Sequence, residues 1–407
     1  MRQFAGVIDR TSGTPHAPRA HDLAMITLFQ AGHGWTVANA SESNLDDRAD
    51  YVLGSQSAWF TQPSGGSPAW IERTGLRLDL SARIVRLWLR VEGDLSGLGD
   101  ITLYAGDAGF ANYYKWPVET SPSPSNQYLK AGEGWVMMDL GFGDATAVGA
   151  PRREAIEVLR IRVDAPVGGD TTLHVNGVAS YPEPVAWPDG VVSLSFDDGW
   201  ADAYDHARPI LDAFGYPATA YVIRELIGKP QRLKREQLHS LEDHSGWEVA
   251  GHSDRLAVHD ARWTQIGPEA LTEDIERLQR WLRSEGFRGA NHCAYPGGAF
   301  NDAVLQTVRR YWRAARTIIQ SSTEVTTPPN PLKLRAWSMV DAAPPRALID
   351  RVERARAGRQ WCILTFHHVV ASDTVNTDYA TGDFRSVIEH IHASGIPVRT
   401  VGDVLGI

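Results

Sequence analysis

The chain has 407 residues, 43% of them hydrophobic and 22% charged, which is the composition of a globular protein. Its 40 basic and 49 acidic residues give a formal net charge of −9, which argues against nucleic acid as the main partner because phosphate binding requires a basic face. The longest apolar runs are about six residues, whereas a membrane helix needs roughly 20, so we expect no membrane span. The two cysteines, Cys293 and Cys362, are too few for a disulfide framework and are expected to be buried apolar side chains.

Two short segments divide the chain. Residues 1–20 show no periodicity and lack the apolar core of a secretory signal, so we expect an extended N-terminal arm there. Residues 181–189 carry three prolines, which predict a stiff, extended linker. The linker separates a region at 21–180 from a region at 190–407, and the two regions have different patterns.

The region at 21–180 has the pattern of an all-β domain. Short alternating runs separated by Gly, Pro and Ser predict a β-sandwich, with a loop at 121–126. Residues 54–60 (GSQSAWF) and the run at 172–175 resemble jelly-roll carbohydrate-binding modules. The runs lie at residues 76–80, 84–91, 100–104, 135–140, 158–163 and 172–175. Some of the chain's 14 tryptophans could be flat platforms for sugar rings, but for the aromatic segment 113–116 a core role fits equally well. We therefore expect a carbohydrate-binding or an assembly domain.

The region at 190–407 alternates strands and helices. Strands are predicted at residues 191–195, 218–223, 247–250, 291–295, 314–319, 335–340, 361–366 and 398–401. Helices are predicted at 202–214, 234–242, 268–285, 302–311, 345–357 and 384–393, and the helix at 268–285 has the clearest apolar stripe. Seven or eight such units in this length favour a barrel, that is, a distorted α/β fold of the (β/α)7 type. Such a barrel carries its chemistry on the loops that follow the strands.

Polar residues gather after these strands. The strand ends carry, in chain order, Asp197 and Asp198, then His252 and His259, then the turn of Tyr295 and Gly297, then Arg316, and finally His367 and His368. Each of these features alone is common in structural roles. Their joint occurrence at strand ends indicates a catalytic site on one face of the barrel.

The residue types explain the chemistry. One carboxylate and two imidazoles can hold a catalytic Zn²⁺ or another divalent first-row ion such as Co²⁺, Ni²⁺ or Mn²⁺. Because Asp197 and Asp198 are adjacent, they point to opposite sides of an extended chain and cannot share one role. One of them can bind the metal while the other acts as general base, with a histidine as general acid. Backbone N–H groups of a tight turn can stabilise the oxyanion.

These motifs resemble those of the NodB-homology polysaccharide deacetylases, carbohydrate esterase family four. The first motif matches residues 195–199 (SFDDG), which implies that Asp197 is the base and Asp198 a metal ligand. The second motif implies His252 and His259 as the other ligands. The third matches residues 294–298 (AYPGG), where Tyr295 and Gly297 would contact the oxyanion or the substrate. The last matches the strand that ends at His367, the implied acid.

The sequence departs from the family in two places. The family spaces its histidine pair by one helical turn, whereas His252 and His259 are seven residues apart. A straight strand would separate them by about 23 Å and a helix by about 10 Å, so residues 253–258 must bulge and return. His292 and Asp254 are the reserve ligands. The arginine that orients the base in the family is replaced by Ala294, and Arg316 is expected to reach the same place from the next strand.

The leading interpretation is a metal-dependent hydrolase that removes N-acetyl or O-acetyl groups from a polysaccharide. One rival is an inactive glycan-binding or structural protein on the same barrel, and another is a small-molecule amide hydrolase. Because glycan polymers lie outside the cell and no export signal is present, we expect a bacteriophage tail protein that contacts other tail proteins. Cytoplasmic location, non-classical export and oligomerisation stay open.

Overall fold

The computed structural model describes residues 22–93, 95–120, 127–165, 167–339, 343–372 and 375–407. The predicted arm at 1–20 and the predicted loop at 121–126 lie outside the described residues. The chain divides into two compact units, Met1–Val185 and Ala186–Ile407. Residues 181 and 182, which we expected in the linker, still belong to the last strand of the first unit.

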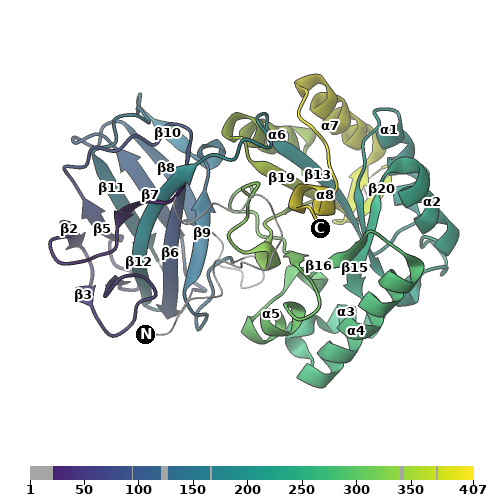
Figure 1. The fold of residues 1–407 in the computed structure, drawn as a ribbon, viewed down its shortest axis with the longest axis horizontal. Helices are drawn as coiled ribbons and strands as arrows, with labels where there is room; N and C mark the ends of the chain where they lie inside the picture. The colour runs from purple at the N-terminus through teal and green to yellow at the C-terminus, as the bar shows by residue number, and fades with distance from the viewer. Residues whose placement is uncertain (1–21, 94, 121–126, 166, 340–342, 373–374) are drawn as a thin grey trace. The chain divides into compact units, whose positions relative to one another are not determined.

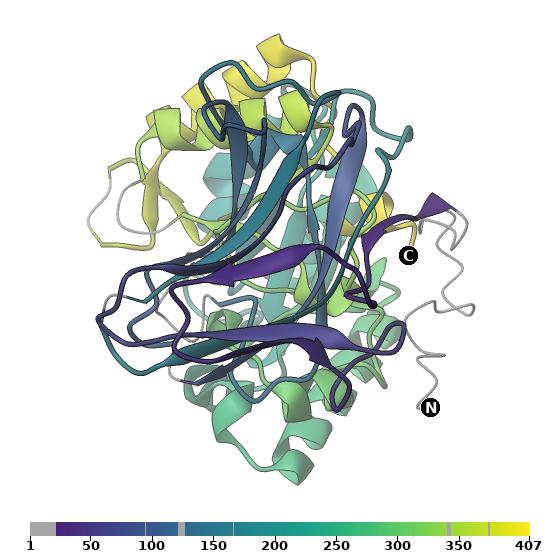
Figure 2. The same ribbon diagram turned by 90° about the vertical axis from the view of Figure 1, so that its left-hand side faces the viewer.

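The N-terminal unit contains two six-stranded antiparallel sheets, which Figures 1 and 2 show as separate layers. The first sheet consists, in spatial order, of β3 (Ser43–Asp47), β4 (Ser57–Gln62), β12 (Thr171–Pro182), β6 (Arg83–Gly93) and β9 (Val136–Leu140), with β1 (Ala24–Thr27) paired to β12. The second consists of β10 (Thr146–Val148), β8 (Tyr113–Glu119), β7 (Asp100–Gly106), β11 (Val158–Asp164), β5 (Ala69–Arg73) and β2 (Trp35–Ala38).

Alternation along these strands separates the core from the solvent. On β6 the side chains of Leu87 and Leu89 are fully buried, whereas Glu92 on the other face is exposed. Trp116, for which both a core and a sugar-binding role were open, is fully buried and donates its indole N–H to Gly141 O at 2.9 Å. It is therefore a core residue.

The C-terminal unit is built on a seven-stranded parallel sheet (Figure 1). In spatial order its strands are β17 (Ala314–Arg316), β16 (Gly289–Ala294), β15 (Glu248–Ser253), β14 (Thr219–Ile223), β13 (Val191–Asp197), β19 (Trp361–Phe366) and β18 (Trp337–Ser338). A parallel bridge between Arg316 and Leu334, just before β18, joins the two edge strands. The sheet is thus a curled, distorted barrel whose closure is irregular, because the bridge lies outside β18.

Helices follow most of these strands, and a small parallel sheet follows β19. The helices are α1 (Arg208–Asp212), α2 (Arg235–Ser245), α3 (Leu256–Ala261), α4 (Pro268–Glu285), α5 (Asp302–Val308), α6 (Pro345–Gly358), α7 (Thr381–Ser394) and α8 (Val401–Leu405). The small sheet pairs β20 (His368–Val370) with β21 (Asp378–Ala380). None of the helices that the structure describes has the length and hydropathy needed to cross a bilayer.

Three sequence predictions about these elements are wrong. Residues 76–80 form no strand, because only Leu78 makes an isolated bridge. The final strand predicted at 398–401 is reduced to a bridge at Val398, because the Thr400 side chain accepts a hydrogen bond from the Asp403 N–H and caps α8. The helix predicted at 202–214 begins with a π-helical turn at Ala203–Ala207 before α1. Strands β1 to β5, β8 and β10 were not predicted.

Helix α4 shows why the clearest sequence pattern holds. Pro268 occupies its first turn, where no backbone donor is lost, and Gly286 ends it at a φ of 80° that suits glycine. Its apolar stripe, which includes Leu271 and Leu278, is buried against β15 and β16. The buried stripe fixes the orientation of the helix and packs against β15.

Replacing Leu278 with alanine should lower the free energy of unfolding by about 2–5 kcal/mol, because the side chain is fully buried and its loss leaves a cavity. Urea denaturation of the full chain measures the change. Arg277→Ala on the exposed side of the same helix is the control and should change stability by less than about 0.5 kcal/mol. Equal effects of the two substitutions would contradict the assignment of the buried face.

Candidate metal centre and active site

The two adjacent carboxylates are separated by a sharp turn. Strand β13 ends at Asp197, and Asp198 then adopts a left-handed backbone with a φ of 68°, followed by Gly199 with a φ of 69°. Such a conformation costs a non-glycine residue about 1–2 kcal/mol, although aspartate tolerates it better than most. Arg232 donates from Nη1 to Asp198 O at 2.9 Å and holds the turn. The turn directs the two side chains to different neighbours.

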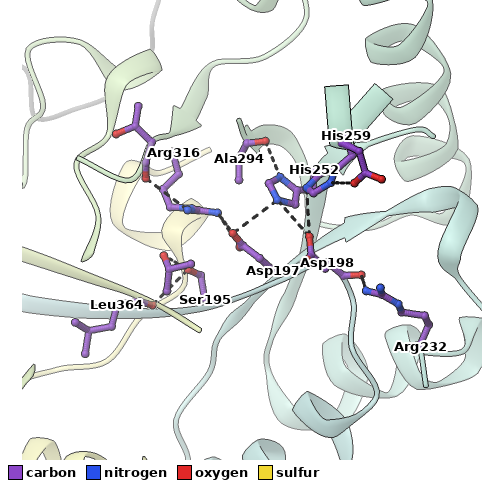
Figure 3. Close-up of polar contacts among 12 residues, drawn as sticks. Ser195, Asp197, Asp198, Arg232, His252, His259, Ala294, Arg316 and Leu364 are labelled. Atoms are coloured by element: carbon purple, nitrogen blue, oxygen red, sulfur yellow. Dashed lines mark hydrogen bonds and ion pairs between the residues drawn. The ribbon is translucent and has the colours of Figure 1, made fainter. Parts of the chain in front are cut away.

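Asp198, His252 and His259 lie together (Figure 3). Their candidate ligand atoms all lie within 4.8 Å of one another. The Asp198 Oδ1 atom is 3.6 Å from His252 Nε2 and 3.3 Å from His259 Nε2. His252 lies near the end of β15, two residues beyond the predicted end of that strand, and His259 lies on α3. The chain leaves the strand at Ser253 and returns as a short helix, so the seven-residue spacing is compatible with one site.

The environment of these three side chains fits a divalent cation. Burial lowers the pKa of His252 to about 4, so the ring is neutral at pH 7, as a metal ligand must be. His252 Nδ1 lies 3.0 Å from Ala294 O, a contact that leaves Nε2 free to bind a metal. Asp198 Oδ1 is buried and makes no hydrogen bond to any described residue. A buried carboxylate oxygen without a donor, beside two imidazoles, is suited to a metal ion.

The reserve ligands lie elsewhere in the fold. His292 is buried between Tyr221, whose hydroxyl is 3.1 Å from His292 Nδ1, and Glu248, whose Oε1 is 3.1 Å from His292 Nε2. Asp254 is fully buried and forms an ion pair with Arg224. Neither belongs to the triad. Cys293 and Cys362 are both buried, as expected, and neither forms a disulfide.

Asp197 is held by a buried ion pair with Arg316. The Arg316 Nη2 atom is 2.7 Å from Asp197 Oδ1 and 2.5 Å from Oδ2, and the guanidinium also lies 5.0 Å from the centre of the Tyr221 ring. Burial raises the pKa of the Asp197 carboxyl, but the charge and hydrogen bonds of Arg316 outweigh it and lower this pKa below its ordinary value. Asp197 is therefore ionised and oriented, and Arg316 makes the contact that the sequence predicted for it.

His367 follows β19 next to Asp197. Strands β13 and β19 pair in register, with Ser195 opposite Thr365 and their hydroxyl oxygens 2.9 Å apart. The register continues to Phe196 and Phe366, the residues that directly precede Asp197 and His367, and the side chains of Asp197 and His367 interact electrostatically. His367 is half-buried, and its Nδ1 is buried without a hydrogen bond to any described residue.

The next residue, His368, has a different environment. Its Nδ1 lies 2.6 Å from Asp202 Oδ2, and its ring lies 4.0 Å from the Trp200 ring, centre to centre. With Asp202 and Trp200 as its partners, it is engaged outside the metal triad.

The two residues expected at the oxyanion differ in their surroundings. The predicted role of Tyr295 is not supported, because its backbone N–H donates to Arg316 O at 3.0 Å and its hydroxyl donates to Leu332 O at 2.9 Å. Both donors are used within the protein, and the side chain is fully buried. Gly297 is exposed with a φ of 57°, and the Arg262 guanidinium lies over it. Of the predicted pair, only Gly297 is accessible.

Sequence reasoning missed the residues that support the turn. Arg232 lies in the loop between β14 and α2 and stacks on Trp200, with its guanidinium carbon 3.1 Å from the ring centre. Burial lowers the pKa of Arg232. Trp200 follows the SFDDG motif directly and could have been noted, whereas no pattern in the sequence marks Arg232.

Comparison with known proteins finds similarity over part of the C-terminal unit. Residues 185–312 match the family model described as polysaccharide deacetylase. A poly-beta-1,6-N-acetyl-D-glucosamine N-deacetylase from Staphylococcus epidermidis is 24% identical over 139 residues, which cover 32% of this chain and 48% of that protein. Its counterpart from Staphylococcus aureus strain N315 is 22% identical over the same shares of the two chains. The chain thus spans about half the length of these relatives.

Among solved structures, a family 4 acetyl xylan esterase from Clostridium thermocellum in complex with a cobalt ion is 15% identical, with a TM-score of 0.38, covering 53% of this chain and 90% of that one. The matched residues 185–312 of the C-terminal unit are thus similar to polysaccharide deacetylases, the family that the sequence motifs resemble. Arg316 and His367 lie beyond the residues that match the family model, so their positions rest on the fold alone.

Replacing His259 with alanine should weaken Zn²⁺ binding by at least about tenfold, because one of three ligand atoms is removed. Titration calorimetry on chelator-treated full chain measures the affinity. His239→Ala, at a partly exposed histidine paired with Glu285, is the control and should bind as the parent does. Retention of parental affinity by the His259 variant would remove this residue from the ligand set.

Proposed function

We propose that the chain is a metal-dependent hydrolase that removes acetyl groups from a polysaccharide. The observation that carries the proposal is the position of an ionised, arginine-oriented carboxylate, Asp197, 3.7 Å from His252 of the ligand triad. A carboxylate without a metal role beside a set of metal ligands is the arrangement that activation of a water molecule requires.

We propose that Asp198, His252 and His259 would hold Zn²⁺. When bound, this ion would act as a Lewis acid and lower the pKa of a water molecule. Asp197 accepts the proton of the attacking water on a carboxylate oxygen. Arg316 donates to both carboxylate oxygens of Asp197 and so restricts rotation of this group. His367, which lies beside Asp197 in the strand register, donates a proton to the departing nitrogen or oxygen.

The substrate class rests on the relatives. The Staphylococcus proteins are named as N-deacetylases of poly-beta-1,6-N-acetyl-D-glucosamine, which supports an N-acetylated polysaccharide as the substrate of this chain. The site chemistry serves O-acetyl groups equally well, because the same attack on the acetyl carbonyl cleaves either bond. Attachment to a bacteriophage tail stays a prediction.

Replacing Asp197 with asparagine or His367 with alanine should lower kcat at least about 100-fold, because each removes one proton-transfer group. Acetate release from an N-acetylglucosamine oligomer measures the rate, and elemental analysis should show that the metal is retained. His368→Ala is the matched control and should lose far less, because its ring is engaged with Asp202. An inactive His368 variant beside an active His367 variant would reassign the general acid.

Replacing Arg316 with methionine should move the acid limb of the pH–rate profile to higher pH. Burial raises the pKa of Asp197 and the Arg316 charge lowers it, so without the guanidinium the carboxyl loses its proton only at higher pH. Arg316→Lys keeps the positive charge, so the acid limb of its pH–rate profile should shift less than in the methionine variant. An unchanged profile in the methionine variant would show that Arg316 does not control the ionisation of Asp197.

A further inference from the structure

The outer face of the first sheet of the N-terminal unit carries a row of aromatic and charged side chains. In the strand register His174 on β12 lies opposite Trp59 on β4 and opposite Arg90 on β6. Trp135 directly precedes β9, whose Val136 pairs with Leu89, so the indole falls next to Arg90. The row therefore crosses four strands at one end of the sheet.

The contacts within the row show that it is one cluster. The His174 ring lies 6.2 Å from the Trp59 ring and 6.1 Å from the Trp135 ring, centre to centre. Arg90 Nη2 lies 3.0 Å from His174 Nε2 and its Nε lies 2.8 Å from Asp50 Oδ2, and Trp135 donates its indole N–H to Asp50 Oδ1 at 2.9 Å. Two indoles thus flank a hydrogen-bonded polar centre.

The outer face is partly accessible at this end of the sheet, although His174, at the centre of the row, is only 5% exposed. The next residues along the strands are polar: Thr61 and Thr172, whose hydroxyl oxygens are 2.8 Å apart, and Glu92, whose side chain is 50% exposed. Trp59 and Trp135 are half-buried, and the only ring or guanidinium that contacts Trp59 among the described residues is the tilted His174. Large aromatic rings left partly open on a polar sheet face mark a binding surface rather than a core.

The charges select the class of ligand. Arg90 faces two carboxylates, Asp50 and Glu92, and burial together with the charge of Arg90 lowers the pKa of His174, so the imidazole adds no positive charge. The cluster therefore has a slight negative balance and interleaved donors and acceptors. A phosphorylated or sulfated polymer is repelled, whereas a neutral ligand rich in hydroxyl groups finds both kinds of partner.

We propose that Trp59, Trp135 and the polar centre between them form a second glycan-binding site, which takes the sugar rings of a neutral polysaccharide. The C–H face of a pyranose ring packs on an indole, and its hydroxyl groups hydrogen-bond with Arg90, Asp50 and Glu92. The site depends on the proposed function only for the choice of probe, since binding here needs neither the metal triad nor Asp197. It gives the all-β unit the role of holding the polymer.

Calorimetric titration of the full chain with hexamers of N-acetylglucosamine, glucose and xylose tests this site. The titrations use the His252→Ala background, so that turnover does not alter the probe. The double variant Trp59→Ala/Trp135→Ala should bind the preferred hexamer at least about tenfold more weakly, the loss expected when buried aromatic contacts are removed. Glu92→Gln, at an exposed position that does not threaten folding, should also weaken binding.

Trp70→Ala is the matched control. Trp70 is half-buried on the other sheet, but Arg160, which is paired with Glu72, lies 5.0 Å from its ring centre and covers it. This variant should bind as the parent does. Three outcomes would overturn the proposal. The folded double variant and Glu92→Gln could both bind with parental affinity, Trp70→Ala could lose as much affinity as the double variant, or the parent could bind none of the three hexamers. Loss of binding in a chain that releases no acetate would uphold this site while the proposed hydrolase fails.

Discussion

The candidate site depends on the buried ion pair between Asp197 and Arg316. Both side chains are almost fully buried, and a carboxylate at such a depth stays ionised only beside a positive charge. Removing one partner of such a pair typically costs about 3–5 kcal/mol, because the other charge is left uncompensated. The pair joins the end of β13 to the end of β17, on opposite sides of β14, β15 and β16 in the sheet order. It can form only when the parallel sheet curls, so the fold and the ionised base depend on each other.

The second constraint is the left-handed turn at Asp198. An extended chain would place the two carboxylates on opposite faces of β13, one of them far from any useful partner. The positive φ angles at Asp198 and Gly199 instead keep both near His252, which lies 3.7 Å from Asp197 Oδ2 and 3.6 Å from Asp198 Oδ1. Arg232 and Trp200 stabilise this conformation from outside the triad. The left-handed turn therefore gives Asp197, the proposed base, and Asp198, the proposed metal ligand, different neighbours although they are consecutive residues.

The two units suggest a division of labour. Under the proposed function, the barrel supplies the metal ligands and the proton-transfer groups for one acetyl group at a time. A polymer also needs to be held, and the row from Trp59 to Trp135 offers rings and polar groups for that purpose on a separate scaffold. Both proposals concern neutral, hydroxyl-rich ligands, which agrees with a formal net charge of −9.

The sequence by itself determined the elements with strong local patterns. Helix α4 and strand β19 lie at the predicted residues, because an apolar stripe of helical period and a continuous apolar run each have one compact solution. The sequence also showed that carboxylates and imidazoles follow several strands. Because the strands of successive βα units are parallel, these residues gather on one face of the sheet.

Only the tertiary structure decided which of these side chains meet. The pairing of β13 with β19, between strands 170 residues apart, brings the chain that follows Phe366 close to Asp197, where His367 interacts electrostatically with this carboxylate while His368 contacts Asp202. The contacts that use both donors of Tyr295 come from β17 and from Leu332. The edge strands β2, β3 and β10 of the N-terminal unit carry weak apolar alternation, because most of their residues are exposed or half-buried. Local patterns fix elements, but the geometry of a site arises from long-range contacts that no local pattern encodes.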